Sequence, residues 1–489
     1  MKIEHETTIP RAMPNAHAIT GRAGHDASTV SHVAYDTLKR LASGAPRFLA
    51  TAPGRLDVMS GLADFSGALV LQMPLAEHVC LAAQARQDGM VTVATVPESD
   101  GPEWLRQMSV DSLVEASRIS AQDSPFAQLF ADVRGNDGHC VRSVWGVLIE
   151  MLRSKIVEGL GGGLSLVVGS TMGDLRDLGK ESATAAATLA AVARVMNKTP
   201  EPIAAAQVCH RVINDWLKLP VGMSETFCSL IGEPHTVTQL RCDPCTLVGA
   251  MRLPKSLALI GVHCGTVDPE WRRRYERART AACMGRALID RIVKHAGGNH
   301  SLGDGGLARV SVADFVERFR DRLPTKLKGS EFHSRFGETG DPLTRIEPEV
   351  VYKIRSRTEH HIYENARAND FVECLARWMR TGDESELGRV RDLMHASHWS
   401  YGQRSGLGSV ETDLLTNLLR QHGRDVGIVG SRISGRGCGG VVAVLLKATK
   451  ESHDALHSAI VDYEQKTGKS TTLLRGSLPG ALTAGVRQL

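Results

Sequence analysis

The sequence has no long hydrophobic run, few aromatic residues and little net charge, and each of these absences excludes a class of protein. No apolar stretch reaches the roughly 18 residues that a membrane-spanning helix needs. Aromatic residues make up 4% of the 489 residues, which argues against a protein that stacks nucleic-acid bases on aromatic side chains. The 58 basic and 54 acidic residues give a net charge of +4, too small a bias for a polyanionic partner. We therefore expect neither a membrane nor a nucleic acid as partner.

The start of the chain and its cysteines also lack the features of a secreted protein. The first 17 residues contain acidic residues and prolines where a signal peptide has its apolar stretch, which favours a cytoplasmic protein. The 10 cysteines are scattered, mostly inside apolar segments, as is typical of reduced, buried thiols. Cys242 and Cys245 form the one close pair. Without a second pair, they indicate a surface turn after a strand in preference to a metal or redox site.

The composition is that of a soluble globular protein with more than one domain. Apolar residues make up 42% and charged residues 23% of the chain, and its length predicts roughly two to four domains. Short β-rich segments alternate with segments of helical periodicity, which predicts an α+β fold in two lobes. The predicted organisation is an N-terminal extension at 1–45, an N-terminal domain at 46–255 and a C-terminal domain at 256–489.

The first motif lies at 51–67, where we expect a strand, a Pro-Gly turn and a second strand. Arg55, Asp57 and Asp64 follow the turn within about ten positions. An arginine and a carboxylate near a turn can form a simple salt bridge. The fork of Arg55 can equally orient a carboxylate or a hydroxyl-rich ligand.

The second motif is a glycine-rich turn at 430–440, between two apolar strands. Its glycines include Gly435 and Gly437. So many glycines indicate close backbone approach or positive φ angles. Successive N–H groups in such a turn can also hold anionic oxygens, so a phosphate contact is the alternative interpretation.

The third motif, at 220–227, begins a predicted helix and contains Gly222 and Glu225. A glutamate in the first turn is stabilised by the helix dipole, which makes a simple capping role one interpretation. A first-turn carboxylate beside an arginine could also act as a base.

In this order, the three motifs resemble those of the GHMP sugar kinases, and in particular the galactokinase and L-arabinokinase branch. The resemblance runs from about Phe48 to the C-terminus. It implies a two-lobed fold with a ferredoxin-like C-terminal domain and a site in the cleft between the lobes. It also implies that ATP and Mg²⁺ serve to phosphorylate the anomeric hydroxyl of a small-molecule sugar.

The resemblance assigns roles to individual residues of this sequence. Arg55 falls beside the transferred phosphoryl group, and Glu225 replaces the catalytic aspartate. The substrate contacts that it implies are Asp57, Asp64, Gly222 and Tyr275. The Gly435 and Gly437 turn matches the family's third motif and is predicted to contact the nucleotide.

The chain departs from the family in the phosphate-binding loop. An ungapped alignment places 177–183 on that loop, where the family has glycines and serines at a helix N-terminus. Asp177 and Glu181 would each repel a phosphate by roughly 1 kcal/mol or more at about 4 Å, which neighbouring cations could offset in part. The nucleotide contacts predicted here are Arg176, Gly179, Lys180 and Ser182.

The family's metal-binding and catalytic positions are also changed. The magnesium-binding glutamate falls on Ile213, so no metal ligands are predicted. Glu225 is one methylene longer than the aspartate that it replaces, and a displacement of about 1 Å can cost on the order of 10²-fold in rate.

Three hypotheses follow. The chain is an active sugar 1-kinase with a rearranged phosphate loop, in which Arg176 and Lys180 point at the triphosphate. Alternatively, it is a pseudokinase that binds a sugar without ATP turnover, or an enzyme that uses Glu225 and Arg55 for another reaction.

Overall fold

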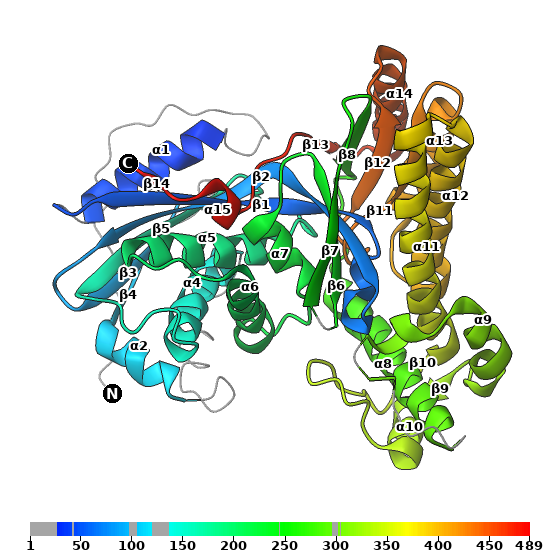
Figure 1. Ribbon diagram of the computed structural model, residues 1–489, viewed down its shortest axis with the longest axis horizontal. Helices are drawn as coiled ribbons and strands as arrows, with labels where there is room; N and C mark the ends of the chain where they lie inside the picture. Colours follow the sequence, from blue (N-terminus) through cyan, green and yellow to red (C-terminus); the bar gives the residue numbers. More distant parts are fainter. Residues whose placement is uncertain are drawn as a thin grey trace.

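The computed structural model forms two lobes (Figure 1). The residues that it describes are 27–41, 44–96, 105–119, 136–243, 245–295, 302–303 and 305–489. Most of the predicted N-terminal extension, up to residue 26, lies outside these described residues.

The N-terminal lobe is built on an eight-stranded sheet with the order β14-β1-β2-β5-β3-β4, in which β6 also pairs with β2 and β7 pairs with β6. The branching arises because β2 is long: Leu69–Gln72 pairs with β6, whereas Val79–Ala85 pairs with β5. The strands are β1 Arg47–Met59, β2 Leu69–Ala85, β3 Met90–Thr95, β4 Leu105–Ser109, β5 Gly163–Ser170, β6 Thr236–Cys242, β7 Cys245–Arg252 and β14 Arg487–Gln488.

Helices cover both faces of this sheet (Figure 1). Successive strand residues point to opposite faces, so Cys80 and Ala82 pack against α1 while Leu81 and Ala83 join the main core on the other side. The alanine-rich α5 lies close to β1 and β2 in that core because its side chains are small. The helices are α1 Ala27–Leu41, α2 Val110–Ser117, α4 Asn136–Arg153, α5 Lys180–Val195, α6 Pro202–Arg211 and α7 Ser224–Ile231.

The C-terminal lobe contains a four-stranded antiparallel sheet with the order β11-β12-β8-β13. Along the chain its strands follow a β-α-β-β-α-β pattern, which is the ferredoxin-like arrangement that the resemblance implied. The α+β architecture predicted for the chain is thereby confirmed. The strands are β8 Leu257–His263, β11 Ile428–Ile433, β12 Val441–Lys447 and β13 Thr472–Leu474, and the helices packed with them are α11 Ile354–Thr381, α12 Glu384–Ser400, α13 Val410–Gly423 and α14 Lys450–Thr467.

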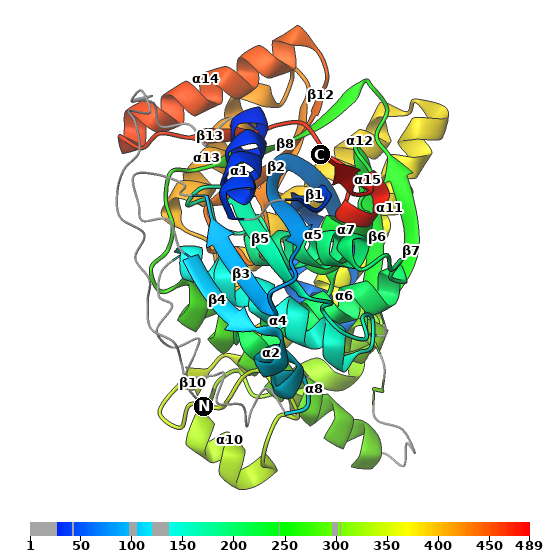
Figure 2. The same ribbon diagram turned by 90° about the vertical axis from the view of Figure 1, so that its left-hand side faces the viewer.

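A smaller helical part extends the lobe at the end opposite α13 and α14 (Figures 1 and 2). It contains α8 Trp271–His295, α9 Val312–Asp314, α10 Gly329–Phe336, β9 Leu327–Lys328 and β10 Val351–Tyr352. After β13 the chain returns to the N-terminal lobe, where α15 Ala481–Ala484 packs on α7 and β14 pairs with β1. The predicted domain boundary at 255 and 256 therefore does not separate the lobes completely.

Within the described residues, no helix has the length and apolar character needed to cross a bilayer.

The predicted turn at Pro53–Gly54 is wrong, because β1 continues through it. A shift in the pairing with β2 between Pro53 and Arg55 accommodates the proline, as a bulge does in an antiparallel pair. Gly54 serves a different purpose: a Cβ atom there would lie 2.8 Å from the carbonyl oxygen of Leu178. Its absence lets the segment before α5 approach β1, where the Arg55 N–H donates to the same carbonyl at 2.8 Å.

Candidate active site

Glu225 lies between two arginines where the lobes meet. It is in the first turn of α7, it is 5% exposed, and it forms ion pairs with Arg55 of β1 and with Arg436 of the turn between β11 and β12. The Arg436 Nη2 atom is 3.3 Å from Oε2, and the Ser182 hydroxyl donates to the same oxygen at 3.4 Å. Burial alone would raise the pKa of Glu225, but the two arginines outweigh it and lower the pKa to about 2. The carboxylate is therefore ionised at neutral pH.

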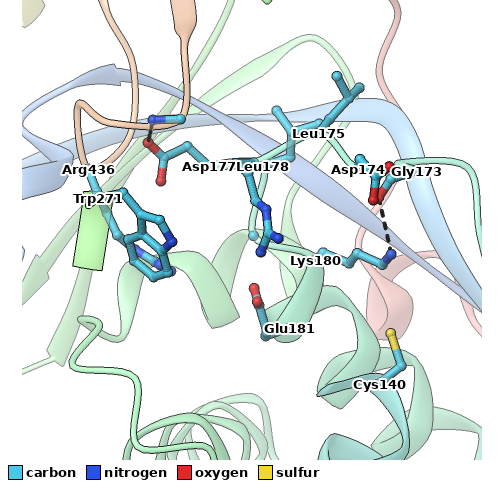
Figure 3. Close-up of a pocket in the computed structure, with 13 residues that line it drawn as sticks. Cys140, Gly173, Asp174, Leu175, Asp177, Leu178, Lys180, Glu181, Trp271 and Arg436 are labelled. Carbon is cyan, nitrogen blue, oxygen red and sulfur yellow. Dashed lines mark hydrogen bonds between the residues drawn. The ribbon is translucent and has the colours of Figure 1, made fainter. Parts of the chain in front are cut away.

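A small hollow, open to solvent, lies beside this cluster at the N-terminus of α5. Gly179 precedes the helix with a φ of 77°, so the conformation there suits glycine. Lys180 folds back onto the carbonyl oxygen of Gly173 at 3.2 Å, and the Trp271 ring lies against Arg436 (Figure 3). The hollow is lined by Cys140, 173–181, Trp271, Arg436 and Gly439.

Charges of both signs surround this hollow. Arg176, Lys180 and Arg436 line it together with Asp174, Asp177 and Glu181. Of the four nucleotide contacts predicted in this segment, Arg176, Gly179 and Lys180 line the hollow. Ser182 is fully buried and faces Glu225.

The Asp177 carboxylate has partners of its own in the glycine-rich turn. It accepts hydrogen bonds from the backbone N–H groups of Cys438 and Gly439, at 3.3 and 2.8 Å, while its carbonyl oxygen accepts one from Arg55. Cβ atoms on Gly435 and Gly439 would lie 3.0 and 2.6 Å from the Asp177 Cβ. The glycines therefore provide room for this aspartate. Gly439, which lines the hollow, was not among the residues predicted from the sequence.

Gly437 and Asp57 are among the predicted site residues that do not line the hollow. A Cβ on Gly437 would meet the ring of Tyr401 at 2.8 Å, so this glycine serves packing. Asp57 is fully buried and pairs with Arg432 at 3.2 Å. It also accepts hydrogen bonds from the N–H groups of Gly61 and Gly435, at 2.9 and 3.2 Å. We assign Asp57 to the junction of the lobes in place of the predicted sugar contact.

Asp64 and Gly222 are in contact. Asp64 belongs to the 3₁₀ helix Gly61–Ser66, and its carboxylate accepts hydrogen bonds from the Phe65 N–H at 2.6 Å and from the Ser224 hydroxyl at 3.0 Å. A Cβ on Gly222 would lie 1.7 Å from the Asp64 Oδ2 atom, so only glycine fits there. Burial, helped by the charge of Glu225, raises the pKa of Asp64 to about 6.

Tyr275 lies near Asp64, but the adjacent Arg279 was missed. Tyr275 is 2% exposed and packs with Leu62 and Ile433. Arg279 follows it by four residues on α8, so both side chains share one helix face. It is also buried, and forms a two-pronged ion pair with Asp341. The spacing of four residues from Tyr275 was the sequence signal that could have indicated Arg279. For Arg436, the sequence offered no signal beyond its position in the glycine-rich turn.

The position at which the resemblance predicts a magnesium-binding glutamate is apolar and closed. Ile213, in the π-helical turn Val212–Trp216, is 1% exposed. In the part of the chain that the structure describes, no group of three or more histidine, cysteine or acidic side chains could hold a metal ion. Glu181 remains a carboxylate that lines the hollow. Cys242 and Cys245 face each other where β6 ends and β7 begins, which confirms the predicted turn.

Comparison with known proteins finds similar sugar kinases. No family model matches the chain. An L-arabinokinase of Arabidopsis thaliana is 28% identical over 493 residues, which cover 89% of this chain and 46% of that protein, so the chain spans about half of its length. Human galactokinase is 23% identical over 438 residues, covering 89% of this chain and 92% of that protein.

Solved structures give the fold. The crystal structure of Lactococcus lactis galactokinase complexed with galactose matches with a TM-score of 0.69 at 14% identity, covering 94% of this chain and all of the other. Methanococcus jannaschii mevalonate kinase matches with a TM-score of 0.50 at 10% identity, covering 88% of this chain and 98% of the other.

The chain therefore has the two-lobed fold of the GHMP kinases. Within that class, its relatives confirm the predicted likeness to the galactokinase and L-arabinokinase branch, and with it a sugar-kinase-like protein.

Proposed function

We propose that the protein transfers the γ-phosphoryl group of ATP to the anomeric hydroxyl of a monosaccharide. The observation that carries this proposal is the buried Arg55–Glu225–Arg436 cluster between the hollow at α5 and the carboxylate of Asp64. Phosphoryl transfer depends on positioning and on cations that meet developing charge. A site with two fixed guanidinium groups beside a carboxylate supplies both.

Each residue of the cluster then has a role. Arg55 and Arg436 stabilise the charge on the transferred group. Glu225 acts by orienting the sugar hydroxyl and balancing the arginines, because a carboxylate with a pKa of about 2 is a weak proton acceptor. Asp64, with Gly222 and Tyr275 nearby, holds the sugar hydroxyls.

The triphosphate of ATP would lie in the hollow at α5. The helix N-terminus favours an anion there, and Arg176, Lys180 and Arg436 add positive charge on the lining. The partners of Asp177 in the glycine-rich turn offset part of the repulsion expected from its carboxylate. Magnesium commonly binds proteins through one or two carboxylates plus the substrate phosphates. Glu181 is the residue that we assign to it, in place of the position occupied by Ile213.

A pseudokinase that binds a sugar is the second candidate. Two observations favour it: Ile213 is buried where the family has a metal ligand, and the carboxylates of Asp174, Asp177 and Glu181 line the hollow. Weak binding of nucleotide with retained binding of sugar would follow.

The test is a panel of free sugars and sugar acids incubated with ATP and Mg²⁺, read by phosphosugar formation, with Glu225→Gln as the inactive control. Product from at least one sugar, lost in the control, supports the kinase. Calorimetric titration of the same panel, without nucleotide, follows. Sugar binding with no product from any sugar would establish the pseudokinase instead.

A further inference from the structure

Arg279 is held in one geometry by contacts on several sides. Its Nε and Nη2 atoms donate to the two oxygens of Asp341, at 2.9 and 3.0 Å. Asp341 is fixed in turn, since it accepts hydrogen bonds from the Thr344 hydroxyl at 2.6 Å and from the Leu343 N–H at 3.3 Å. The side chains of Arg279 and Asp341 are 6% and 4% exposed. A bidentate pair with so little exposure is both strong and directional.

The same guanidinium also contacts two other segments, one through its Nη1 atom and the other through its flat face. Its Nη1 atom donates to the carbonyl oxygen of Pro220 at 3.5 Å, and its carbon atom lies 4.3 Å from the centre of the Phe65 ring. Phe65 follows Asp64, whose carboxylate its N–H holds at 2.6 Å. Pro220 begins the short segment that leads to Gly222, whose backbone lies against the Asp64 carboxylate.

We propose that Arg279, fastened by Asp341, is a positioning residue that presses the Phe65 and Pro220–Gly222 segments together and so sets the place of the Asp64 carboxylate. The inference rests on the proposed function in one respect, the contact between Asp64 and the sugar. By this inference, loop 337–348 contributes to sugar recognition without touching the sugar, because its residue Asp341 holds Arg279 in place.

The charge of Arg279 adds a second effect. Burial dominates the raised pKa of Asp64, and Arg279 opposes it. The charge of Glu225 also raises the pKa of Asp64, whereas the hydrogen bonds from the Ser224 hydroxyl and the Phe65 N–H lower it. Asp64 in turn acts to raise the pKa values of its titratable neighbours on α8 and the β6–β7 hairpin, which are Tyr275, Cys242 and Cys245. Among these groups, Arg279 is the one that carries a positive charge. Its loss therefore shifts the ionisation of Asp64 to higher pH.

The test compares Arg279→Met with Arg279→Lys, Asp341→Asn and a matched control. Arg277→Met is the control, because Arg277 lies on the same helix and makes a similar two-pronged pair with Glu347 at the surface. Hydrogen exchange of the ligand-free proteins is measured first. We expect amides at 61–67 and 221–224 to exchange at least tenfold faster in Arg279→Met and to be unchanged in the control. Unchanged exchange in both segments of Arg279→Met would overturn the inference whether or not any sugar binds.

Calorimetric titration with a sugar from the panel follows. For Arg279→Met we expect a Kd for sugar at least tenfold higher and a Kd for Mg-ATP within threefold of the parent. We also expect the acid limb of the pH profile, the range in which sugar binding weakens as Asp64 is protonated, to move to higher pH. Arg279→Lys keeps that limb in place but loses part of the affinity. A loss of sugar and nucleotide binding together, without a shift of the limb, would indicate a structural role and reject the proposal. Failure of the kinase proposal is separate, since it shows only as absence of phosphosugar from the parent protein.

Discussion

The carboxylate of Asp177 accepts a hydrogen bond from the backbone N–H of Gly439 at 2.8 Å, across 262 residues of sequence. This bond joins the segment that begins α5 to the turn between β11 and β12, and so links the two lobes beside the hollow. In the glycine-rich turn, an N–H pair that could hold an external anion holds an internal one instead. The hydrogen bond thereby holds the loop before α5 to the other lobe.

Removing this charge should strengthen the binding of polyphosphate. Asp177→Asn keeps an oxygen that can accept from Gly439 but takes one negative charge from the lining, so we expect the Kd of tripolyphosphate to fall by about threefold to tenfold, on the order of 1 kcal/mol. Calorimetric titration measures it. Asp177→Ala is the comparison, because it removes the charge and the tether together and should not gain as much. Weaker binding by Asp177→Asn would mean that the carboxylate organises the site and does not oppose the anion.

Glu225 should contribute strongly to stability, because it separates two buried arginines. Glu225→Gln leaves Arg55 and Arg436 without their counterion, and we expect a loss of about 3–5 kcal/mol at pH 7 in urea unfolding. The folded pKa of about 2 lies below the ordinary 4.5, so the stabilisation is full above pH 4.5 and is lost as the pH falls towards 2.

The difference in stability between parent and Glu225→Gln should therefore narrow at acid pH. Glu331→Gln is the control, since its pair with Arg335 is exposed and an exposed pair contributes little. A difference that stays constant between pH 7 and pH 3 would argue against the ion pairs as its source.

The sequence was informative where a local pattern has one structural outcome. The alternation of β-rich and helical segments predicted an α+β fold, and the order of elements in the structure has this character. Motif order placed Arg55, Glu225 and Asp64, and the structure brings all three to the junction of the lobes. Pro53 misled, because a bulge lets β1 accept a residue that usually ends a strand.

What the sequence could not reveal are the partners chosen by tertiary contact. Asp57 and Asp64 are seven residues apart and chemically alike, yet one pairs with Arg432 and the other lies at Gly222. Arg279 is one of several arginines on α8. Its burial against Phe65, Pro220 and Asp341 distinguishes it from the surface residue Arg277. Such pairings depend on segments about 60 or more residues away.

Gly222→Ala should displace the Asp64 carboxylate. The added methyl group would lie 1.7 Å from Oδ2, with the nearby backbone unable to move freely because it is buried. We expect loss of sugar binding of at least 10²-fold in calorimetry, with little change for Mg-ATP. Gly388→Ala is a suitable control, since a Cβ there meets only the end of the Arg391 side chain, at 3.6 Å. Retained sugar affinity in Gly222→Ala would remove Asp64 from the sugar site.

Asp64→Asn should lose function and gain stability. The folded pKa of about 6 is above the ordinary 3.8, so the folded state prefers the protonated carboxyl, and ionisation destabilises it progressively as the pH rises from about 4 through 6. A neutral amide avoids this cost, which is at most about 2–3 kcal/mol at pH 7. We expect the Tm of Asp64→Asn to exceed that of the parent by several degrees at pH 7.5 and to approach it at pH 4, while sugar binding is lost. Asp370→Asn, at an exposed position, controls for the substitution itself. A variant less stable than the parent at pH 7.5 would show that the hydrogen bonds to Phe65 and Ser224 outweigh the cost of burying the charge.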